Sequence, residues 1–227
     1  MIKREMYMKR IRPFIGNDLI KVMTGIRRAG KSVMLELIQE ELIASGIDED
    51  NFICINFEDL RNVHLLNAMA LHEEILKRAE QLKGKVYLFF DEIQEVEDWE
   101  KCINSFRVSL DCDIYITGSN AKLLSGELVT YLGGRYVEFV IYPFSFLEFL
   151  ELYHTVNSTA SVQECFQKYL LVGGMPYLSN IRYEEEPSKQ YLSDLFNSVQ
   201  LKDIVKRNKV RDVDLLERLI AYVMANV

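Results

Sequence analysis

Cysteine and histidine are scarce in this sequence of 227 residues, which contains four cysteines and three histidines. The cysteines are far apart and form no CxxC pair, and the histidines stand alone; the cysteines are Cys54, Cys102, Cys112 and Cys165. This spacing argues against a zinc site of the usual kinds and against a disulfide framework. We expect reduced, mostly buried thiols, as in a cytosolic protein.

Basic residues are outnumbered by acidic ones, and long apolar runs are missing. The formal net charge of -7 at pH 7 argues against a surface built mainly to hold nucleic acid. No apolar run approaches the length of a membrane helix, and no segment has the pattern of a secretory signal. We therefore expect a cytoplasmic protein with no membrane partner. A hydrophobic content of 49% over this length suffices for one full α/β domain and a smaller helical part.

Short apolar runs alternate with helical patterns between residues 19 and 141. The runs predict strands at 19–24, 52–56, 86–90, 114–117 and 136–141. Apolar residues at helical spacing predict helices between them, at 31–45, 67–82, 99–110 and 121–132. Several runs are almost wholly apolar, which is typical of parallel strands covered on both faces. The alternation predicts an α/β fold built on a parallel sheet.

The rest of the chain shows only helical signals. Residues 1–18 form an amphipathic pattern interrupted at Pro13, which predicts a short N-terminal helix. After Pro143 no strand signal follows, and the last helical pattern stops without an end signal, so we expect the natural protein to continue. The expected domains are a core at 1–142, a helical lid at 143–205 and the start of a further C-terminal region at 206–227.

The first predicted strand runs into GIRRAGKS at residues 25–32, which fits the phosphate-binding pattern GxxxxGK[S/T]. The loop opens a helix, so its backbone N–H groups and the helix N-terminus point at one place, where phosphate oxygens are stabilised. Lys31 would pair with the β- and γ-phosphates of ATP, and the Ser32 hydroxyl would bind Mg²⁺. Arg27 and Arg28 either steer phosphate or face solvent. The expected ATP contacts are Gly25, Arg27, Arg28, Ala29, Gly30, Lys31, Ser32 and Val33.

A second signal follows the buried run VYLFF at 86–90, which ends in Asp91 and Glu92. A parallel sheet places both acids at its carboxyl edge, where ligands of such sheets bind. Asp91 would orient Mg²⁺ through its water shell, and Glu92 would polarise the attacking water, because phosphoryl transfer is accelerated by positioning and charge stabilisation. Acids at strand ends are often merely solvated, so the assignment of this pair to a site depends on the nearby glycine loop. Glu58 and Asp59, at the same edge, form a weaker candidate.

These motifs resemble those of the AAA+ ATPases, and within them of bacterial and archaeal proteins called simply ATP-binding proteins. The matching segments span nearly all of the chain; they are GIRRAGKS, FFDEIQEVEDWE, ITGSN, LGGRYVEF, YPFSFLEF and LLVGGMPY. The resemblance implies a five-stranded parallel sheet in the order 5-1-4-3-2, with the strand carrying Thr117 between the strands that end in the loop and in Asp91. It also implies a helical lid, a winged-helix-like region beginning near residue 206, and then a domain of unknown function.

The resemblance assigns roles around the expected site. Ser119 or Asn120 corresponds to sensor 1, the polar group that contacts the γ-phosphate or the attacking water, although a Ser-Asn pair after a strand is also a common turn and helix cap. Arg135 corresponds to an arginine finger that reaches a neighbouring subunit's nucleotide, with a solvated arginine as the alternative. Pro176 corresponds to the lid proline near adenine, although a helix-ending turn has the same letters. Sensor 2 stays unassigned among Arg182, Arg207 and Arg211.

The sequence thus predicts Mg²⁺-dependent ATP binding and hydrolysis coupled to movement of the lid and C-terminal region. The alternative is a slow nucleotide-dependent switch with little turnover, which recruits a protein or nucleic-acid partner through that region. Homo-oligomerisation rests on Arg135 acting in trans. A small-molecule kinase is disfavoured, because the lid shows neither an acceptor pocket nor an arginine cluster. The resemblance favours ATP over GTP, and no guanine-reading NKxD motif occurs.

Overall fold

A computed structural model describes residues 2–118, 132–199 and 212–226. The chain divides into two compact units, Met1–Tyr177 and Leu178–Val227. The three-part domain division expected from the sequence stays a prediction. The helix predicted at 121–132 lies outside the described residues except for its last position.

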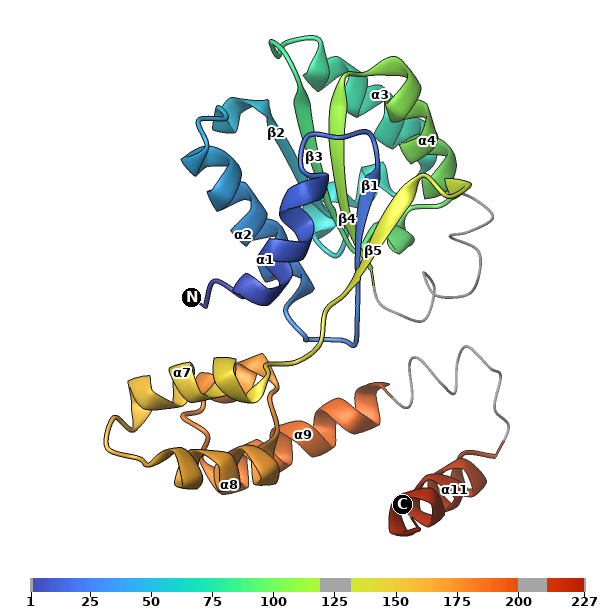
Figure 1. Ribbon diagram of the computed structural model, residues 1–227. Helices are drawn as coiled ribbons and strands as arrows, with labels where there is room; N and C mark the ends of the chain where they lie inside the picture. Colours follow the sequence, from blue (N-terminus) through green and yellow to red (C-terminus); the bar gives the residue numbers. More distant parts are fainter. Residues whose placement is uncertain (1, 119–131, 200–211, 227) are drawn as a thin grey trace. The chain divides into compact units, whose positions relative to one another are not determined.

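The first unit is built on a sheet of five parallel strands (Figure 1). The strands are β1 (Ile20–Thr24), β2 (Phe52–Asn56), β3 (Val86–Asp91), β4 (Cys112–Thr117) and β5 (Tyr136–Val140). Their order is β2-β3-β4-β1-β5, which confirms the predicted 5-1-4-3-2 order and the place of β4 between β3 and β1. The predicted strand ends differ from the observed ones by at most two residues.

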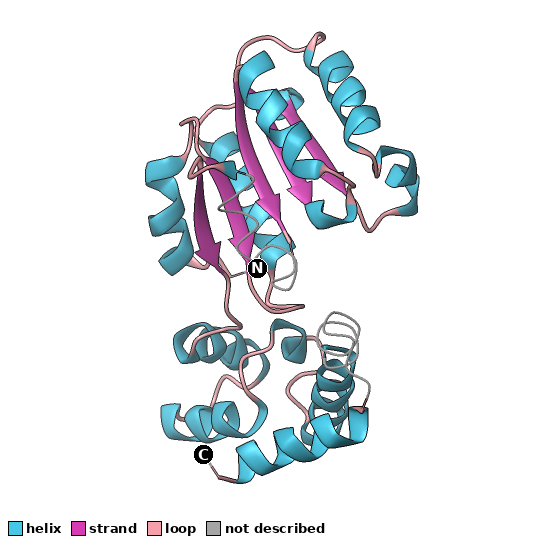
Figure 2. Ribbon diagram, turned by 90° about the vertical axis from the view of Figure 1, so that its right-hand side faces the viewer, coloured by secondary structure: helices cyan, strands magenta, loops and turns pink. Residues whose placement is uncertain are grey.

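Helices cover both faces of this sheet (Figure 2). Side chains from α3 (Ala68–Ala79) and α4 (Trp99–Ser109) join one apolar core, and those from α1 (Glu5–Ile11) and α2 (Lys31–Ala44) join the other. Strand β3 serves both cores, because Leu88 and Phe90 face one while Tyr87 and Phe89 face the other. This two-sided burial explains why its sequence is continuously apolar.

Two further helices are described in the first unit, α7 (Phe146–Val156) and α8 (Val162–Val172). Each begins with a capping box, formed by Ser145 with Glu148 and by Ser161 with Glu164. They pack through aromatic contacts, such as the edge-on pair of Phe146 and Phe166. The short 3₁₀ turns are η1 (Arg12–Phe14), η2 (Glu49–Asn51), η3 (Leu60–Leu65), η4 (Ile93–Glu95) and η5 (Pro176–Ser179).

The described part of the second unit contains α9 (Glu185–Val199) and α11 (Val213–Ala225). Asp212 caps α11, since its side chain accepts a hydrogen bond from the N–H of Leu215. None of the described helices in either unit combines the length and apolarity that crossing a bilayer would need.

An ion pair is buried at the amino ends of β1 and β4. Lys21 donates to Asp113 and to the carbonyl of Leu19 at 2.7 Å, and both charged side chains are 0% exposed. Asp113 also accepts from the N–H of Gly16 at 2.7 Å and from the Tyr115 hydroxyl at 2.8 Å. Burial lowers the pKa of Lys21, although Asp113 opposes that shift. The pair thus fixes the loop that leads into β1.

We predict that Asp113→Asn lowers the free energy of unfolding by about 3–5 kcal/mol, because it leaves the Lys21 ammonium buried without its counter-charge. Urea unfolding at neutral pH measures the loss. Asp111→Asn is the matched control: its ion pair with Lys85 is partly exposed, at 70% and 32% of the two side chains, and should be worth at most about 1 kcal/mol. Equal losses in the two variants would contradict this account.

Candidate functional site

The loop between β1 and α2 lies at the carboxyl edge of the sheet. Gly25 has φ 140°, and a Cβ atom there would lie 2.1 Å from the Ile141 carbonyl oxygen, so only glycine fits. Gly30, with φ 95°, forms the N-cap of α2 without any side-chain cap. The first N–H groups of α2 therefore remain available to an anion at the helix N-terminus.

Lys31, the first residue of α2, is buried within this loop. Its Nζ lies 3.4 Å from the carbonyl oxygens of Gly25 and Ile26, and 3.7 Å from Oε1 of Glu92. The side chains of Lys31 and Glu92 are only 4% and 15% exposed. The lysine of the loop and the second acid of the strand-end pair are thus brought together. Ser32, by contrast, is exposed beside Lys31.

The ends of three neighbouring strands converge on Asp91. Its Oδ2 accepts a hydrogen bond from Nδ2 of Asn56 at 3.0 Å, and its Oδ1 accepts one from the Thr117 hydroxyl. The same hydroxyl oxygen accepts the N–H of Glu92 at 2.9 Å. The Thr117 hydroxyl therefore holds the side chain of Asp91 and the backbone of Glu92.

Glu92 has an unusual backbone conformation. Its φ of 55° is left-handed, which costs a residue other than glycine about 1–2 kcal/mol. Its carboxylate accepts a hydrogen bond from Nε2 of Gln94. Strained backbone of this kind concentrates at functional sites, where surrounding contacts determine it.

Sequence reasoning did not assign a role to Asn56, Thr117 or Gln94. The signal for the first two was available: both are polar, both end a strand, and the predicted strand order makes them neighbours of Asp91. Gln94 lies in the turn after β3, where spacing alone does not show which way a side chain points.

Two of the weaker candidates pair with each other. Arg27 donates to Glu58 at 3.0 Å, and their side chains are 32% and 55% exposed. Asp59 caps η3 and binds Arg61. The acids after β2 are therefore engaged with arginines, whereas Asp91 is held by amide and hydroxyl groups. Arg28 is exposed, and its φ of 63° is left-handed.

The residues named from the resemblance lie apart in the chain. Arg135 is exposed immediately before β5, where its carbonyl accepts the N–H of Ile20. Pro176 lies next to the loop, because a Cβ atom on Gly30 would be 3.9 Å from its Cγ. Outside the described residues lie Ser119, Asn120, Arg207 and Arg211, and Arg182 belongs to the second unit.

Arg4, at the N-cap of α1, contacts both the loop and the segment after β5. It donates through Nη1 to the Ala29 carbonyl at 3.0 Å, through Nη2 to the Tyr142 carbonyl at 2.8 Å, and through Nε to Glu148 at 2.9 Å. The rings of Tyr7 and Phe144 flank the guanidinium, with centroids 4.7 and 5.1 Å from Cζ. Nothing in the sequence pattern indicated this arrangement.

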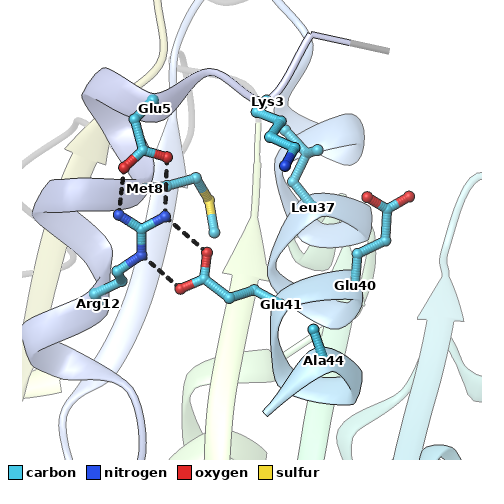
Figure 3. Close-up of a pocket in the computed structure, with 8 residues that line it drawn as sticks. All are labelled: Lys3, Glu5, Met8, Arg12, Leu37, Glu40, Glu41 and Ala44. Atoms are coloured by element: carbon cyan, nitrogen blue, oxygen red, sulfur yellow. Dashed lines mark hydrogen bonds and ion pairs between the residues drawn. The ribbon is translucent and has the colours of Figure 1, made fainter.

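A separate cavity of about 320 Å³ lies between α1 and α2 (Figure 3). Arg12 bridges Glu5 and Glu41 across it. Its lining from α2 comes from the C-terminal part of that helix, and includes no residue of the glycine loop. The lining residues are Lys3, Glu5, Met8, Arg12, Leu37, Glu40, Glu41 and Ala44.

A family model described as an AAA domain matches residues 17–150, more than half of the chain, and this match includes the glycine loop and both strand-end acids. The chain belongs to the AAA+ P-loop ATPases. A second family model, described as a domain of unknown function, matches residues 163–227 of this AAA+ protein.

Two similar curated proteins are described as uncharacterized. One, from Haemophilus influenzae, is 40% identical over 228 residues, which cover 100% of this chain and 56% of the relative. The other, from Methanocaldococcus jannaschii, is 33% identical over 219 residues, which cover 91% of this chain and 47% of the relative. The AAA+ chain thus spans about half the length of these relatives.

Two solved structures share the fold. PCH-2 of C. elegans is 14% identical, with a TM-score of 0.54, and the match covers 84% of this chain and 69% of PCH-2. ORC1 of Aeropyrum pernix, solved in complex with DNA, is 11% identical with a TM-score of 0.50, and the match covers 87% and 65% of the two chains. At these identities the similarity concerns the fold alone.

The carboxylate of Glu148 gives the contact with Arg4 a pH dependence. Burial raises the pKa of Glu148, but hydrogen bonds from Arg4 and Ser145 outweigh it, so the pKa lies below its ordinary 4.5. A lowered pKa in the folded state means that the stabilisation is fully present above pH 4.5 and is lost as the pH falls through the lowered value.

We predict that Glu148→Gln lowers the free energy of unfolding at pH 7 by about 1.5–3 kcal/mol, the worth of hydrogen bonds to a charged group. The difference from the wild type should shrink as the pH falls below 4.5 and through the lowered pKa of Glu148, because the wild-type carboxyl then becomes protonated. Urea titrations across this range measure both effects. Glu164→Gln is the control, because it removes the equivalent capping carboxylate of α8, which pairs with no arginine among the described residues. A difference that stays constant with pH would contradict the prediction.

Proposed function

We propose that this chain binds ATP with Mg²⁺ and hydrolyses it, and that nucleotide state sets the orientation of the lid and of the chain that follows it. The observation that carries the proposal is the meeting of Lys31 and Glu92, 3.7 Å apart, at the start of α2. A glycine loop on a helix N-terminus supplies N–H donors for phosphate, and an acid beside it supplies a base.

The groups around the loop divide the work. Lys31 would leave its present oxygen partners for the β- and γ-phosphates, which offer a stronger charge-assisted contact. Glu92 would then orient the attacking water and accept its proton. Gln94 holds the carboxylate of Glu92 and Thr117 holds its backbone. Both the side chain and the backbone of the base are therefore constrained before the substrate binds.

The oxygen donors at the site suit Mg²⁺. Ser32 offers a hydroxyl at the helix start, and Asp91 offers a buried carboxylate held by Asn56 and Thr117. In the described residues no cluster of three or more acids, histidines or cysteines could cage a metal. That agrees with Mg²⁺ in ATPases, which is held by one or two side chains and the phosphates. When bound, the ion neutralises charge on the phosphates.

The contacts of Glu92 favour a second candidate, a slow nucleotide switch. A base engaged by Gln94 and close to Lys31 has to be released before it meets water, and turnover is slow where release is slow. The ATP and ADP states would then bind a partner differently. ORC1 was solved in complex with DNA, but a net charge of -7 gives this chain no general attraction for nucleic acid. We therefore assign partner binding to the region beyond the AAA+ core.

We predict that Lys31→Ala weakens ATP binding by about 10–100-fold, the loss of a charged hydrogen bond. Glu92→Gln should bind ATP with unchanged affinity but hydrolyse it at least about 100-fold more slowly, because it lacks the base. Calorimetry with Mg·ATP and phosphate-release assays measure the two effects.

Lys101→Ala and Glu97→Gln are the matched controls, because both side chains are exposed and Lys101 pairs with Asp98, the N-cap residue of α4. Tight ATP binding with equal, background turnover in wild type and Glu92→Gln would replace the hydrolase by the switch. Equal ATP affinity in wild type and Lys31→Ala would rule out both.

We further predict that Arg135 acts in trans. Turnover per chain should then rise with protein concentration, and Arg135→Ala should abolish that rise without changing ATP affinity. Mixing Arg135→Ala with Glu92→Gln should restore turnover, because each supplies what the other lacks at a shared site. Arg61→Ala, which removes an arginine that is 89% exposed, is the control. Turnover that is independent of concentration, with no recovery on mixing, would leave Arg135 a surface residue.

A further inference from the structure

Arg4 carries a charge where a charge is costly. Its side chain is 2% exposed, and its φ of 46° is left-handed. Burying an ion costs several kcal/mol before pairing, and the backbone conformation costs about 1–2 kcal/mol. Features of this kind persist only where surrounding contacts determine them. The contacts of Arg4 therefore show what the arginine is held in place to do.

The first contact fixes the glycine loop. Arg4 holds the Ala29 carbonyl at 3.0 Å, and none of the described peptide bonds is cis. In a planar trans peptide the carbonyl and the following N–H point in opposite directions. With its carbonyl turned toward Arg4, the peptide between Ala29 and Gly30 directs the Gly30 N–H away from Arg4. That N–H belongs to the start of α2, where N–H groups lack intrahelical partners and bind anions.

The second contact fixes the start of α7. Arg4 Nε donates to Oε1 of Glu148, while the other oxygen of this carboxylate accepts the N–H of Ser145 at 2.8 Å. Nη2 of Arg4 also holds the Tyr142 carbonyl, and the N–H of Tyr142 donates to the Tyr7 hydroxyl at 3.0 Å. A guanidinium is planar and presents its donors in fixed directions. A shift of α7 therefore has to move the arginine or break one of these bonds.

We propose that Arg4 is a positioning residue of the phosphate-binding loop, which turns the Gly30 N–H toward the nucleotide phosphates and ties that orientation to the first turn of α7. This inference rests on the proposed binding of ATP. It gives the N-terminal helix a role in nucleotide binding. It also couples the free energy of phosphate binding to the orientation of the lid. Movement of the lid would loosen the Gly30 N–H, and bound phosphate would hold the lid.

Arg12, at the C-terminal end of α1, provides a control. It also forms two ion pairs, with Glu5 and Glu41 (Figure 3), but its side chain is 39% exposed and neither of these partners is a residue of the glycine loop. Removing Arg12 takes the same charge from the same part of the chain without touching Ala29. A general effect of charge or of N-terminal stability would appear in both variants.

The test compares the affinities of ATP and adenosine, both with Mg²⁺, in wild type, Arg4→Gln, Arg4→Lys, Glu148→Gln and Arg12→Gln. We expect Arg4→Gln to weaken ATP about tenfold or more while adenosine binding, measured by competition, changes less than about twofold. Arg4→Lys, which keeps the charge but lacks the fork of donors, should lie between wild type and Arg4→Gln. Glu148→Gln should weaken ATP by a smaller factor, and should add nothing in the Arg4→Gln background.

Each result decides the matter. A merely structural Arg4 would weaken ATP and adenosine equally, and that outcome, or an Arg12→Gln effect as large as that of Arg4→Gln, overturns the inference. If Arg4→Gln does not fold by circular dichroism, the same ratio is read from Arg4→Lys and Glu148→Gln, and an unchanged ratio in both overturns it. Lys31→Ala separates the two levels. If it loses ATP while the Arg4 variants do not, only this inference fails; if it binds like the wild type, the proposed function itself fails.

Discussion

A guanidinium can be kept out of water only where its N–H groups find acceptors. In the first unit this requirement holds several separate elements together around Arg4. Arg4 finds its acceptors on the glycine loop, on the segment after β5 and on α7, and two aromatic rings cover its faces. A hydrogen bond to a charged group contributes about 1.5–3 kcal/mol, so these elements hold a common arrangement. The N-terminal helix, short as it is, therefore contributes to the geometry of the loop as well as to the apolar core.

Two glycines allow the backbone segments near Arg4 to pack closely. Gly25 lies against the Ile141 carbonyl and Gly174 against the Phe144 carbonyl, where added Cβ atoms would be 2.1 and 2.0 Å from the oxygens. The Phe144 N–H donates to the Gly174 carbonyl at 2.7 Å, and the Phe144 carbonyl accepts from the Tyr169 hydroxyl at 3.0 Å. The segment between β5 and α7 is thus packed between the start of the glycine loop and the end of α8. Close backbone approach explains Gly174, and the φ of 72° at the C-cap of α8 explains Gly173, so neither glycine of GGMP requires a nucleotide to account for it.

Much of this was available from the sequence. Apolar runs gave the strands to within two residues, and the motif resemblance gave their order. Lys31 and Glu92 meet, with Asp91 next to Glu92 in the chain, because both motifs lie at the carboxyl edge of the sheet. Contacts made across the chain were not available: Arg4 and Glu148 are separated by 144 positions, and Lys21 occupies a run that reads as apolar. Such polar contacts depend on three-dimensional placement, which no local period encodes.

The buried ion pair at the amino ends of β1 and β4 affects how the sheet assembles. Lys21 and Asp113 are 92 positions apart, and β1 pairs with β4 so that Lys21 stands opposite Tyr115. Because side chains alternate between faces, a slip of one residue would turn the partners to opposite sides of the sheet and bury each charge alone. Apolar residues on either side would tolerate many alignments. The ion pair thus destabilises misaligned registers of β1 and β4 and selects the observed register for these two central strands.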